Sequence, residues 1–240
     1  MTLEGAYGVN MNLKKIRRLM KKFNLFCPIR KANPYKRMAR AMQTSNIAPN
    51  KLERRFKAGS PGQILLTDIT YLTYDLNKRA YLSGVKDAVT NEIVAYKVSR
   101  SLDVGFVEDT MEQLKKIQLD SKALINSDQG CHYTSKAFID KVKELGLQQS
   151  MSRRGNCWDN APIESFFGHM KDEFNLFDCK TFEEVVNEID DYMDYYNNYR
   201  YQWNLGRMTP KQYGDKLRNK NKNKKDGRSF DKQPSLLVLT

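Results

Sequence analysis

Hydrophobic and polar positions follow one pattern before about residue 60 and another after it. Between Asn12 and Phe23, apolar residues such as Ile16 and Leu19 recur at helical spacing among basic residues. This pattern predicts a short amphipathic helix with Asn12 as its cap. Two prolines then punctuate a basic linker, and the turn signal AGSPG at 58–62 marks the expected end of this region.

From Gln63 the pattern becomes typical of strands. The segment QILLTDITYL is mostly apolar, as expected of a central strand buried on both faces. AYLSGVKDAVT and EIVAYKVS follow at hairpin spacing, with Thr90 and Asn91 as the turn. The segment around 124–127 predicts a short strand, and LQQSMS predicts an edge strand.

Helical periodicity returns between and after these strands. The predicted helices run from a cap at Asp103 to about 118, from Ser135 to Gly146, from Ile163 to about 174, and over 181–199 with a capping box of Thr181 and Glu184. The predicted order of elements is three strands, then helix, strand, helix, strand and helix. This order indicates an α/β fold. We expect a mixed sheet with helices on its faces.

Charge divides the chain into three parts. Residues 1–60 hold 15 basic and 2 acidic residues, residues 61–210 hold 17 and 23, and residues 211–240 hold 9 and 3. Basic arms suit a polyanion such as DNA, because Lys and Arg at phosphates release condensed counterions. For the last segment a solvated, disordered tail is an equal alternative. A membrane-surface helix at the N-terminus is disfavoured by its short apolar stripe.

Composition excludes several other classes. Neither a run of apolar residues long enough to span a membrane nor an apolar signal-peptide core is present, so export is not expected. Four Cys without a CxxC pair and only two His argue against a zinc finger and a disulfide framework.

Three acids stand out by context. Asp68 lies inside the apolar strand, where a carboxylate is costly unless it is paired or binds a metal. Asp128 ends a short strand, and Glu164 begins a helix after Pro162. Such positions can converge, and hard oxygen ligands select Mg²⁺ or Mn²⁺. Two such ions support phosphodiester chemistry. Alternatively, each acid has a separate structural role at an edge strand, a turn or a helix start.

The residues around these acids carry a specific resemblance. LLTDIT, NSDQGCHYTS and MSRRGNCWDNAPIESFFGHMK, in this order, closely resemble the catalytic blocks of DDE transposases of bacterial insertion sequences. The resemblance is to the branch whose second reading frame encodes a retroviral-integrase-like core, and 35 residues between the last two acids are typical of it. RYQWNLGRMTP resembles the C-terminal block of that family.

The resemblance implies a ribonuclease-H-like mixed five-stranded sheet with flanking helices. It implies Asp68, Asp128 and Glu164 as catalytic residues and ligands of Mg²⁺ or Mn²⁺, with two ions per active site. The implied reaction is water-mediated nicking of the element ends, followed by attack of the freed 3′-hydroxyl on target DNA. Lys171, two helical turns after Glu164, is expected to hold a DNA phosphate. Further DNA contacts are expected from Arg153 and Arg154 in the preceding loop and from Lys14, Arg17, Arg18 and Lys21 of the N-terminal helix.

The expected organisation has four parts. These are a basic, partly helix-turn-helix-like DNA-binding segment (1–58), the catalytic core (59–176), a C-terminal helix with the RYQWN block (177–215) and a basic, disordered tail (216–240). The resemblance implies double-stranded DNA as partner, a homo-oligomer on DNA, an upstream-frame helix-turn-helix protein, and no membrane. The expected location is the bacterial cytoplasm, at the nucleoid.

Two departures from the family pattern leave alternatives open. Asn126 occupies a position where the family usually has His, and Asn cannot take up a proton at neutral pH. If that His tunes the metal site, reduced activity is expected. The N-terminal segment is shorter than in full members, which fits the product of one reading frame or a truncated remnant that only binds DNA. A nuclease of the same fold that cuts RNA–DNA hybrids is the third hypothesis.

Overall fold

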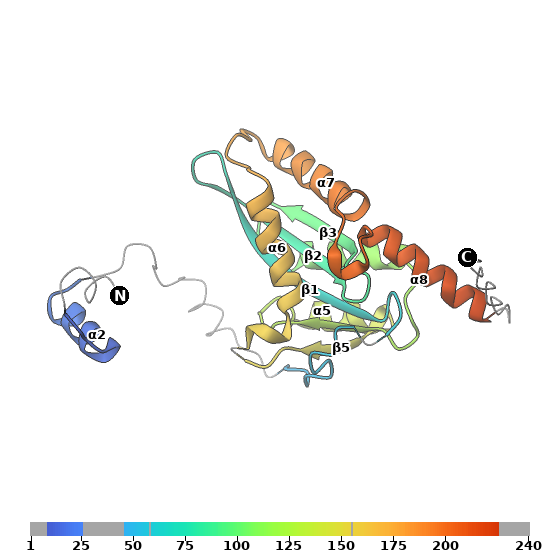
Figure 1. Ribbon diagram of the computed structural model, residues 1–240, viewed down its shortest axis with the longest axis horizontal. Coiled ribbons are helices and arrows are strands. Elements are labelled where there is room, and N and C mark those ends of the chain that lie inside the picture. The colour runs from blue at the N-terminus through green and yellow to red at the C-terminus, as the bar shows by residue number, and fades with distance from the viewer. Residues whose placement is uncertain (1–8, 26–45, 58, 155, 226–240) are drawn as a thin grey trace, which may run out of the picture. The chain divides into compact units, whose positions relative to one another are not determined.

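The computed structural model describes residues 9–25, 46–57, 59–154 and 156–225 of the 240-residue chain (Figure 1). Two compact units are formed, Met1–Met42 and Gln43–Thr240. In the first unit, helix α2 (Leu13–Lys22) begins at Asn12, whose side chain accepts a hydrogen bond from Lys15 N at 2.9 Å. None of the ten residues of α2 is buried. The predicted helix and its cap are confirmed.

The second unit is built on a five-stranded mixed sheet. Its strands are β1 (Ile64–Tyr74), β2 (Lys78–Asp87), β3 (Ile93–Ser99), β4 (Leu124–Ser127) and β5 (Gln148–Met151), in the order β3-β2-β1-β4-β5. β1 is central, antiparallel to β2 and parallel to β4. The predicted central strand, hairpin and edge strand are confirmed.

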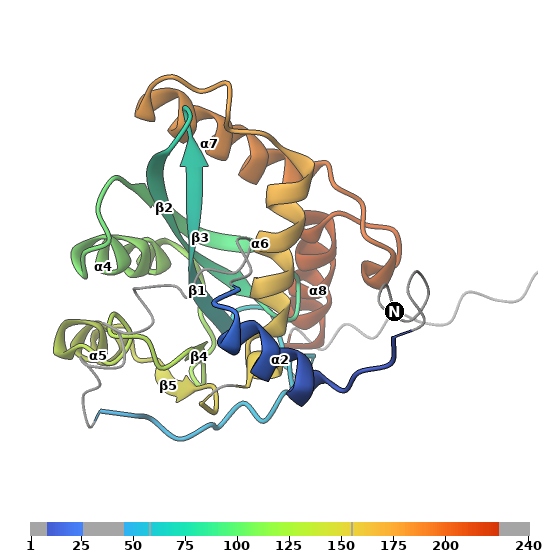
Figure 2. The same cartoon turned by 90° about the vertical axis from the view of Figure 1, so that its left-hand side faces the viewer.

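Helices cover both faces of this sheet (Figure 2). They are α4 (Gly105–Glu112), α5 (Lys136–Glu144), α6 (Ala161–Glu173), α7 (Phe182–Asn198) and α8 (Pro210–Lys225), with short 3₁₀ turns at Gln113–Lys116, Cys157–Asp159 and Trp203–Leu205. The predicted caps at Ser135 and Thr181 are present, and Gly146 ends α5 at a φ of 67°.

Two apolar clusters fill the space between sheet and helices. Leu66 packs in the cluster with Phe166 and Ile189 of α6 and α7, whereas Leu65 packs with Phe138 on the α4–α5 side. Neighbouring residues of β1 therefore face opposite layers, as the apolar run predicted. Burying each such side chain stabilises the fold by about 1.5–3 kcal/mol.

The helix after Asp103 is shorter than its periodicity predicted. α4 ends at Glu112 and continues only as a 3₁₀ turn through Lys116, short of the expected end at about 118. The reason is tertiary, because Gln113 Nε2 donates to Tyr96 O at 2.7 Å and Tyr96 N donates to Gln113 Oε1 at 3.3 Å. This pairing with β3 fixes the chain where the regular helix stops. Asp103 still accepts a hydrogen bond from Phe106 N at 2.9 Å.

The expectation of disorder from residue 216 is wrong for 216–225, which form the second half of α8. Arg218 explains why a polar sequence folds here. Its guanidinium donates to both oxygens of the buried Glu92, at 2.9 and 3.0 Å, and so attaches α8 to the β2–β3 turn. Residues 226–240 of the expected tail lie outside the described residues.

Residues ahead of the predicted boundary at 58 pack against the sheet. The backbone N–H groups of Lys51 and Leu52 donate to Ser150 Oγ at 3.0 and 3.2 Å, and the Leu52 side chain is buried. The second compact unit thus includes Lys51 and Leu52, which lie before the turn signal of the sequence. Among the described helices, none has both the length and the apolar character needed to cross a membrane.

Candidate active site

Asp68 lies on β1, and Asp128 directly follows β4, the strand beside β1 in the sheet. The parallel register pairs Leu66 of β1 with Asn126 of β4. Two residues further along, Asp68 and the residue following β4, Asp128, occupy adjacent positions on the same face. Neighbouring strands are about 4.8 Å apart, so the sheet itself brings these two acids together.

Local backbone contacts orient both carboxylates. Ile69 N donates to Asp68 Oδ1, and Gly130 N donates to Asp128 Oδ1, each at 2.8 Å. A Cβ at position 130 would lie only 2.8 Å from Asp128 Oδ1, closer than such atoms approach. An alanine at position 130 would therefore force the Asp128 carboxylate to shift.

Glu164 lies in the first turn of α6 and is exposed. The start of this helix is attached directly to β1, because Asn160 Nδ2 donates to Thr67 O at 3.2 Å. Thr67 is the neighbour of Asp68 in the chain. The structure thus brings the helix that carries Glu164 to the strand that carries Asp68.

The charge of Asp128 acts on both of the other acids. Burial, and then the charges of Asp128 and Glu164, raise the pKa of Asp68 to about 7, against opposing effects of Ile69 N–H and Lys171. Burial and Asp128 also raise the pKa of Glu164. Asp128 is an exposed residue, yet desolvation by the groups around its carboxylate raises its pKa. The arrangement concentrates negative charge that a bound cation would stabilise.

The donor set fits a hard divalent cation. The three groups offer only carboxylate oxygens, which Mg²⁺ and Mn²⁺ prefer. Within the described ranges, no three His, Cys, Asp or Glu side chains stand close enough together to enclose a metal ion. Closing a site around a cation therefore requires a change of side-chain rotamer, which the long, exposed Glu164 side chain permits.

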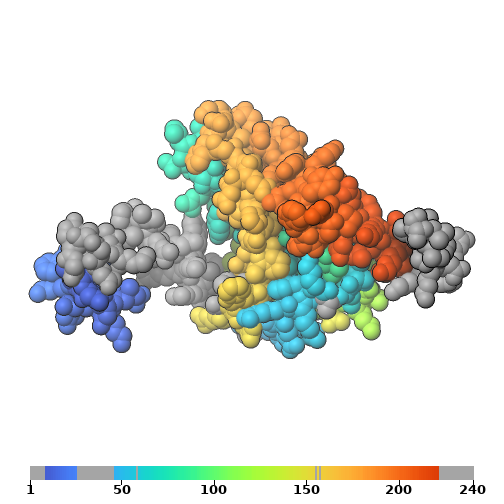
Figure 3. Space-filling model, in the orientation of Figure 1, coloured from blue at the N-terminus to red at the C-terminus, as the bar shows by residue number. Residues whose placement is uncertain are grey.

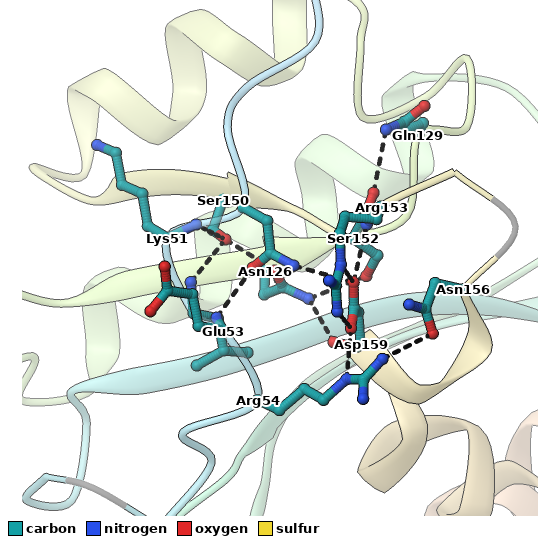
Figure 4. A network of polar contacts seen from close by, with 12 residues as sticks. Lys51, Glu53, Arg54, Asn126, Gln129, Ser150, Ser152, Arg153, Asn156 and Asp159 are labelled. Carbon is teal, nitrogen blue, oxygen red and sulfur yellow. Dashed lines mark hydrogen bonds and ion pairs between the residues drawn. The ribbon is translucent and has the colours of Figure 1, made fainter.

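A polar network centred on Asp159 holds the loop before α6 (Figure 4). The buried Asp159 carboxylate accepts hydrogen bonds from Arg153 Nε at 2.9 Å and NH2 at 3.0 Å, from Arg54 Nε at 2.8 Å, and from Asn50 Nδ2 at 2.9 Å. The hydrogen bonds and charge of Arg153, followed by the Arg54 hydrogen bond, hold the pKa of Asp159 well below its usual range. Sequence reasoning missed Asp159, Arg54 and Asn50, because no local pattern pairs residues more than one hundred positions apart.

Asn126 lies at the centre of the same region and is fully buried. Its Nδ2 donates to Asp159 O at 3.1 Å and to Ser152 Oγ at 3.3 Å, and its Oδ1 accepts from Ser150 Oγ at 2.9 Å. Gln129 Nε2 adds a hydrogen bond to Ser152 O at 3.1 Å. The residue that replaces the usual His therefore joins β4 and β5 to the loop before α6.

The other expected site residues lie on α6, in the loop before it and on α2. Lys171 lies on α6 near Asp68, whose charge partly offsets the burial that lowers the pKa of Lys171. Arg153 is committed to Asp159, while Arg154 is exposed. Lys14, Arg17, Arg18 and Lys21 are exposed on α2, in the other compact unit.

Trp158 of the same loop is 68% exposed, so its indole does not pack into the core. The loop is fixed by the Asp159 hydrogen bonds and does not need the indole. His132 is buried, with Nε2 3.3 Å from Leu102 O.

Comparison with known families gives two matches, both described as integrase core domains. One covers residues 58–157 and the other covers residues 164–217. The chain is 35% identical over 208 residues to InsK of Escherichia coli, named as a transposase for insertion sequence element IS150, covering 86% of this chain and 72% of InsK. It is also 35% identical over 216 residues to a transposase-like protein of Haemophilus influenzae, covering 89% and 97% of the two chains.

Solved structures show the same fold at low sequence identity. The HTLV-2 integrase catalytic core domain, determined in complex with magnesium, superposes with a TM-score of 0.53 and 17% identity, over 65% of this chain and 97% of that one. A chain of the simian T-cell lymphotropic virus intasome gives a TM-score of 0.56 and 13% identity, over 99% and 79%. The predicted ribonuclease-H-like fold is confirmed.

Proposed function

The chain belongs to the insertion-sequence transposases with an integrase core domain, and from this premise we propose that Asp68, Asp128 and Glu164 catalyse its DNA cleavage and strand transfer. As a transposase of the DDE type, the protein is a polynucleotidyl transferase that acts in transposition and DNA integration. The observation that carries the assignment is the continued β1–β4 register, which runs Asp68 alongside Asp128, together with the effect of Asp128 and Glu164 on the pKa of Asp68.

The proposed metal ligands come from two parts of the fold. Asp68 and Asp128 offer oxygens from a rigid sheet, and Glu164 closes the set from α6. The three would hold Mg²⁺ or Mn²⁺, two ions per site, which when bound supply charge stabilisation at the scissile phosphate. Lys171, two turns along α6 on the side of Glu164, positions a phosphate oxygen of the substrate.

The reaction proceeds in two successive displacements at phosphorus. Water attacks phosphorus at the element end, the bond from phosphorus to the 3′-oxygen breaks, and a 3′-hydroxyl and a 5′-phosphate result. The 3′-hydroxyl then attacks a target phosphodiester, so one ester replaces another and no external energy source is needed. The side chains keep the attacking and leaving oxygens in line.

We propose duplex DNA, element end and target, as the partner. Exposed Arg154, Lys171 and the α2 residues Lys14, Arg17, Arg18 and Lys21 would contact its phosphates, with Arg153 serving the loop through Asp159. The intasome relative supports action as an oligomer assembled on DNA. An upstream-frame helix-turn-helix protein is the further partner we propose.

The test is nicking and joining of labelled element-end DNA with Mg²⁺ or Mn²⁺. Asp68→Asn, Asp128→Asn and Glu164→Gln are each expected to lower the rate by at least about a thousandfold, whereas Asp140→Asn on α5 leaves it unchanged. Activity that survives all three changes refutes the site. Salt-sensitive DNA binding without turnover in either metal would instead identify a protein that only binds DNA, and faster cutting of RNA–DNA hybrids would identify a nuclease.

A further inference from the structure

A second polar site lies on the opposite face of α6 from Glu164. It is a cavity of about 890 Å³, within the range of ligand pockets, between α6, the end of α7, the RYQWN segment and Phe56–Lys57. In Figure 3 these surfaces, coloured yellow, orange-red and cyan, adjoin one another on one face of the molecule. We call it the aromatic pocket.

The floor of the aromatic pocket holds a buried cation. Lys86 of β2 is only 5% exposed, at a position facing the apolar α6–α7 layer. Its ammonium donates to Pro162 O at 3.0 Å and lies 5.8 Å from the Phe166 ring centre and 6.0 Å from that of Tyr196. In the part of the chain that the structure describes, no carboxylate forms an ion pair with Lys86.

Nearby charges make this burial more costly. Burial first, and then the positive charges of Lys57 and Arg200, lower the pKa of Lys86 to about 7. The pocket acid Glu173 is already committed to Arg200, which donates to both of its oxygens. Lysine is almost never buried without a counter-ion, because desolvating the charge costs several kcal/mol. An apolar residue would pack here at less cost, so a lysine at this position indicates an anionic ligand, which would favour its protonated form.

The rim of the aromatic pocket is suited to a nucleobase. Tyr195, Tyr199, Tyr201 and Trp203 line it and are 47%, 64%, 66% and 81% exposed. Arg207 lies 4.7 Å from the Trp203 ring centre. Exposed aromatic rings beside cations are how proteins bind unpaired nucleotides, because every base has a face that stacks.

We propose that the aromatic pocket binds the 5′-phosphate end of a DNA strand, with the phosphate on Lys86 and the terminal base on Tyr199 and Trp203. A terminal monoester carries close to two negative charges near neutral pH and an internal diester carries one, so a buried cation favours the terminus. The DNA strand continues on only one side of a terminal phosphate. A terminus can therefore enter a cavity more easily than an internal phosphate can. The inference rests on the proposed function, since hydrolytic nicking leaves such an end.

The test compares a duplex with a short 5′ overhang in its 5′-phosphate and 5′-hydroxyl forms, by fluorescence anisotropy without divalent metal. The full-length protein is expected to prefer the phosphate about tenfold, and Lys86→Met to abolish the preference. Lys86→Met should also raise the melting temperature. Equal affinity for both forms in the unaltered protein, or a preference that persists in Lys86→Met, overturns the proposal.

Rim variants keep the test decisive if Lys86→Met fails to fold. Tyr199→Ala and Trp203→Ala are expected to weaken overhang binding, whereas Phe177→Ala, another exposed aromatic, does not. Unchanged overhang binding in both rim variants overturns the base assignment. If a deoxynucleoside 5′-monophosphate competes as well as the strand end at equal concentration, the ligand is a free nucleotide. That result would overturn the assignment of the pocket to a DNA end.

The outcomes separate this inference from the proposed function. Asp68→Asn should lose nicking and keep the preference for the 5′-phosphate. If the unaltered protein nicks DNA without that preference, only the aromatic pocket is refuted. If the preference is present and nicking is absent in either metal, only the proposed function is refuted.

Discussion

A carboxylate in the middle of β1 has to be stabilised by groups from other elements. Asp68 receives one backbone N–H and the charge of Lys171, while burial and two neighbouring acids oppose its ionisation. The pKa is accordingly raised to about 7. At the scale of single residues, ionised Asp68 therefore destabilises the folded protein, and a bound cation would offset this destabilisation.

That cost is measurable in metal-free protein. The pKa of Asp68 is higher in the folded than in the unfolded protein. The stabilising contribution of its protonated form to folding is therefore fully present below about pH 4 and is lost as pH rises through about 7. Asp68→Asn should therefore raise the free energy of unfolding at pH 8 by roughly 2–4 kcal/mol and change it little at pH 4. Denaturant titration at both pH values measures this, and a variant less stable at pH 8 would contradict it.

Gly130 gives a second test at the same scale. Gly130→Ala places a methyl group 2.8 Å from Asp128 Oδ1 and should displace the carboxylate. We expect nicking to fall by about tenfold or more while circular dichroism stays unchanged. Gly168→Ala, where no atom lies within 4 Å, is the matched control and should stabilise α6 by about 1 kcal/mol. Full activity in Gly130→Ala would show that the turn does not orient Asp128.

At the scale of elements, α6 has to start at a defined place relative to β1. Asn160 and Asp159 achieve this, the first through Thr67 O and the second through two arginines. We infer that the Asp159 network positions Glu164 and does not itself touch the substrate. Arg54, ahead of the matched integrase core region, thus serves the same loop as Arg153.

Asp159→Asn tests this role. The loss of the paired charge should lower the free energy of unfolding by about 2 kcal/mol at neutral pH. Since the folded pKa of Asp159 is depressed, its contribution disappears in acid, so the difference should shrink below about pH 4. Nicking should fall even under conditions where the variant is fully folded. Arg154→Ala is the control for the stability measurement alone, because Arg154 is a proposed DNA contact. Equal stability of Asp159→Asn and the unaltered protein at neutral pH would refute the network.

The same elements show what a sequence reveals and what it does not. Strands and helices followed from local periodicity, and the caps at Asn12, Ser135 and Thr181 followed from residue type. The early end of α4 and the helical start of the tail did not, because Gln113 and Arg218 act on distant partners. For the same reason Lys86 was not recognised, since its burial depends on α6 and α7 packing over β2.

At the scale of the whole molecule, the basic residues concentrate outside the integrase core. Residues 1–60 carry 15 basic and 2 acidic residues, and α2 exposes four of the basic side chains expected to contact DNA. The acidic middle holds the candidate site. We expect the basic segment to supply affinity and the core to supply chemistry.

Replacing Lys14, Arg17, Arg18 and Lys21 together by Gln tests that division. The slope of log affinity against log salt should fall by about 3–4, because each phosphate contact releases close to one counterion. Replacement of the exposed Lys116, Lys122, Lys136 and Lys143 is the control and should change the slope little. An unchanged slope in the α2 variant would place the DNA contacts elsewhere.

Crystals soaked in Mn²⁺ would show whether the three acids bind a metal ion. We expect an anomalous peak within about 2.0–2.4 Å of carboxylate oxygens of Asp68 and Asp128, with Glu164 turned toward it. In crystals of Asp68→Asn that peak should weaken or vanish. A Mn²⁺ peak absent from these three residues in the unaltered protein, at concentrations that support nicking, would contradict the assignment of the three acids as metal ligands.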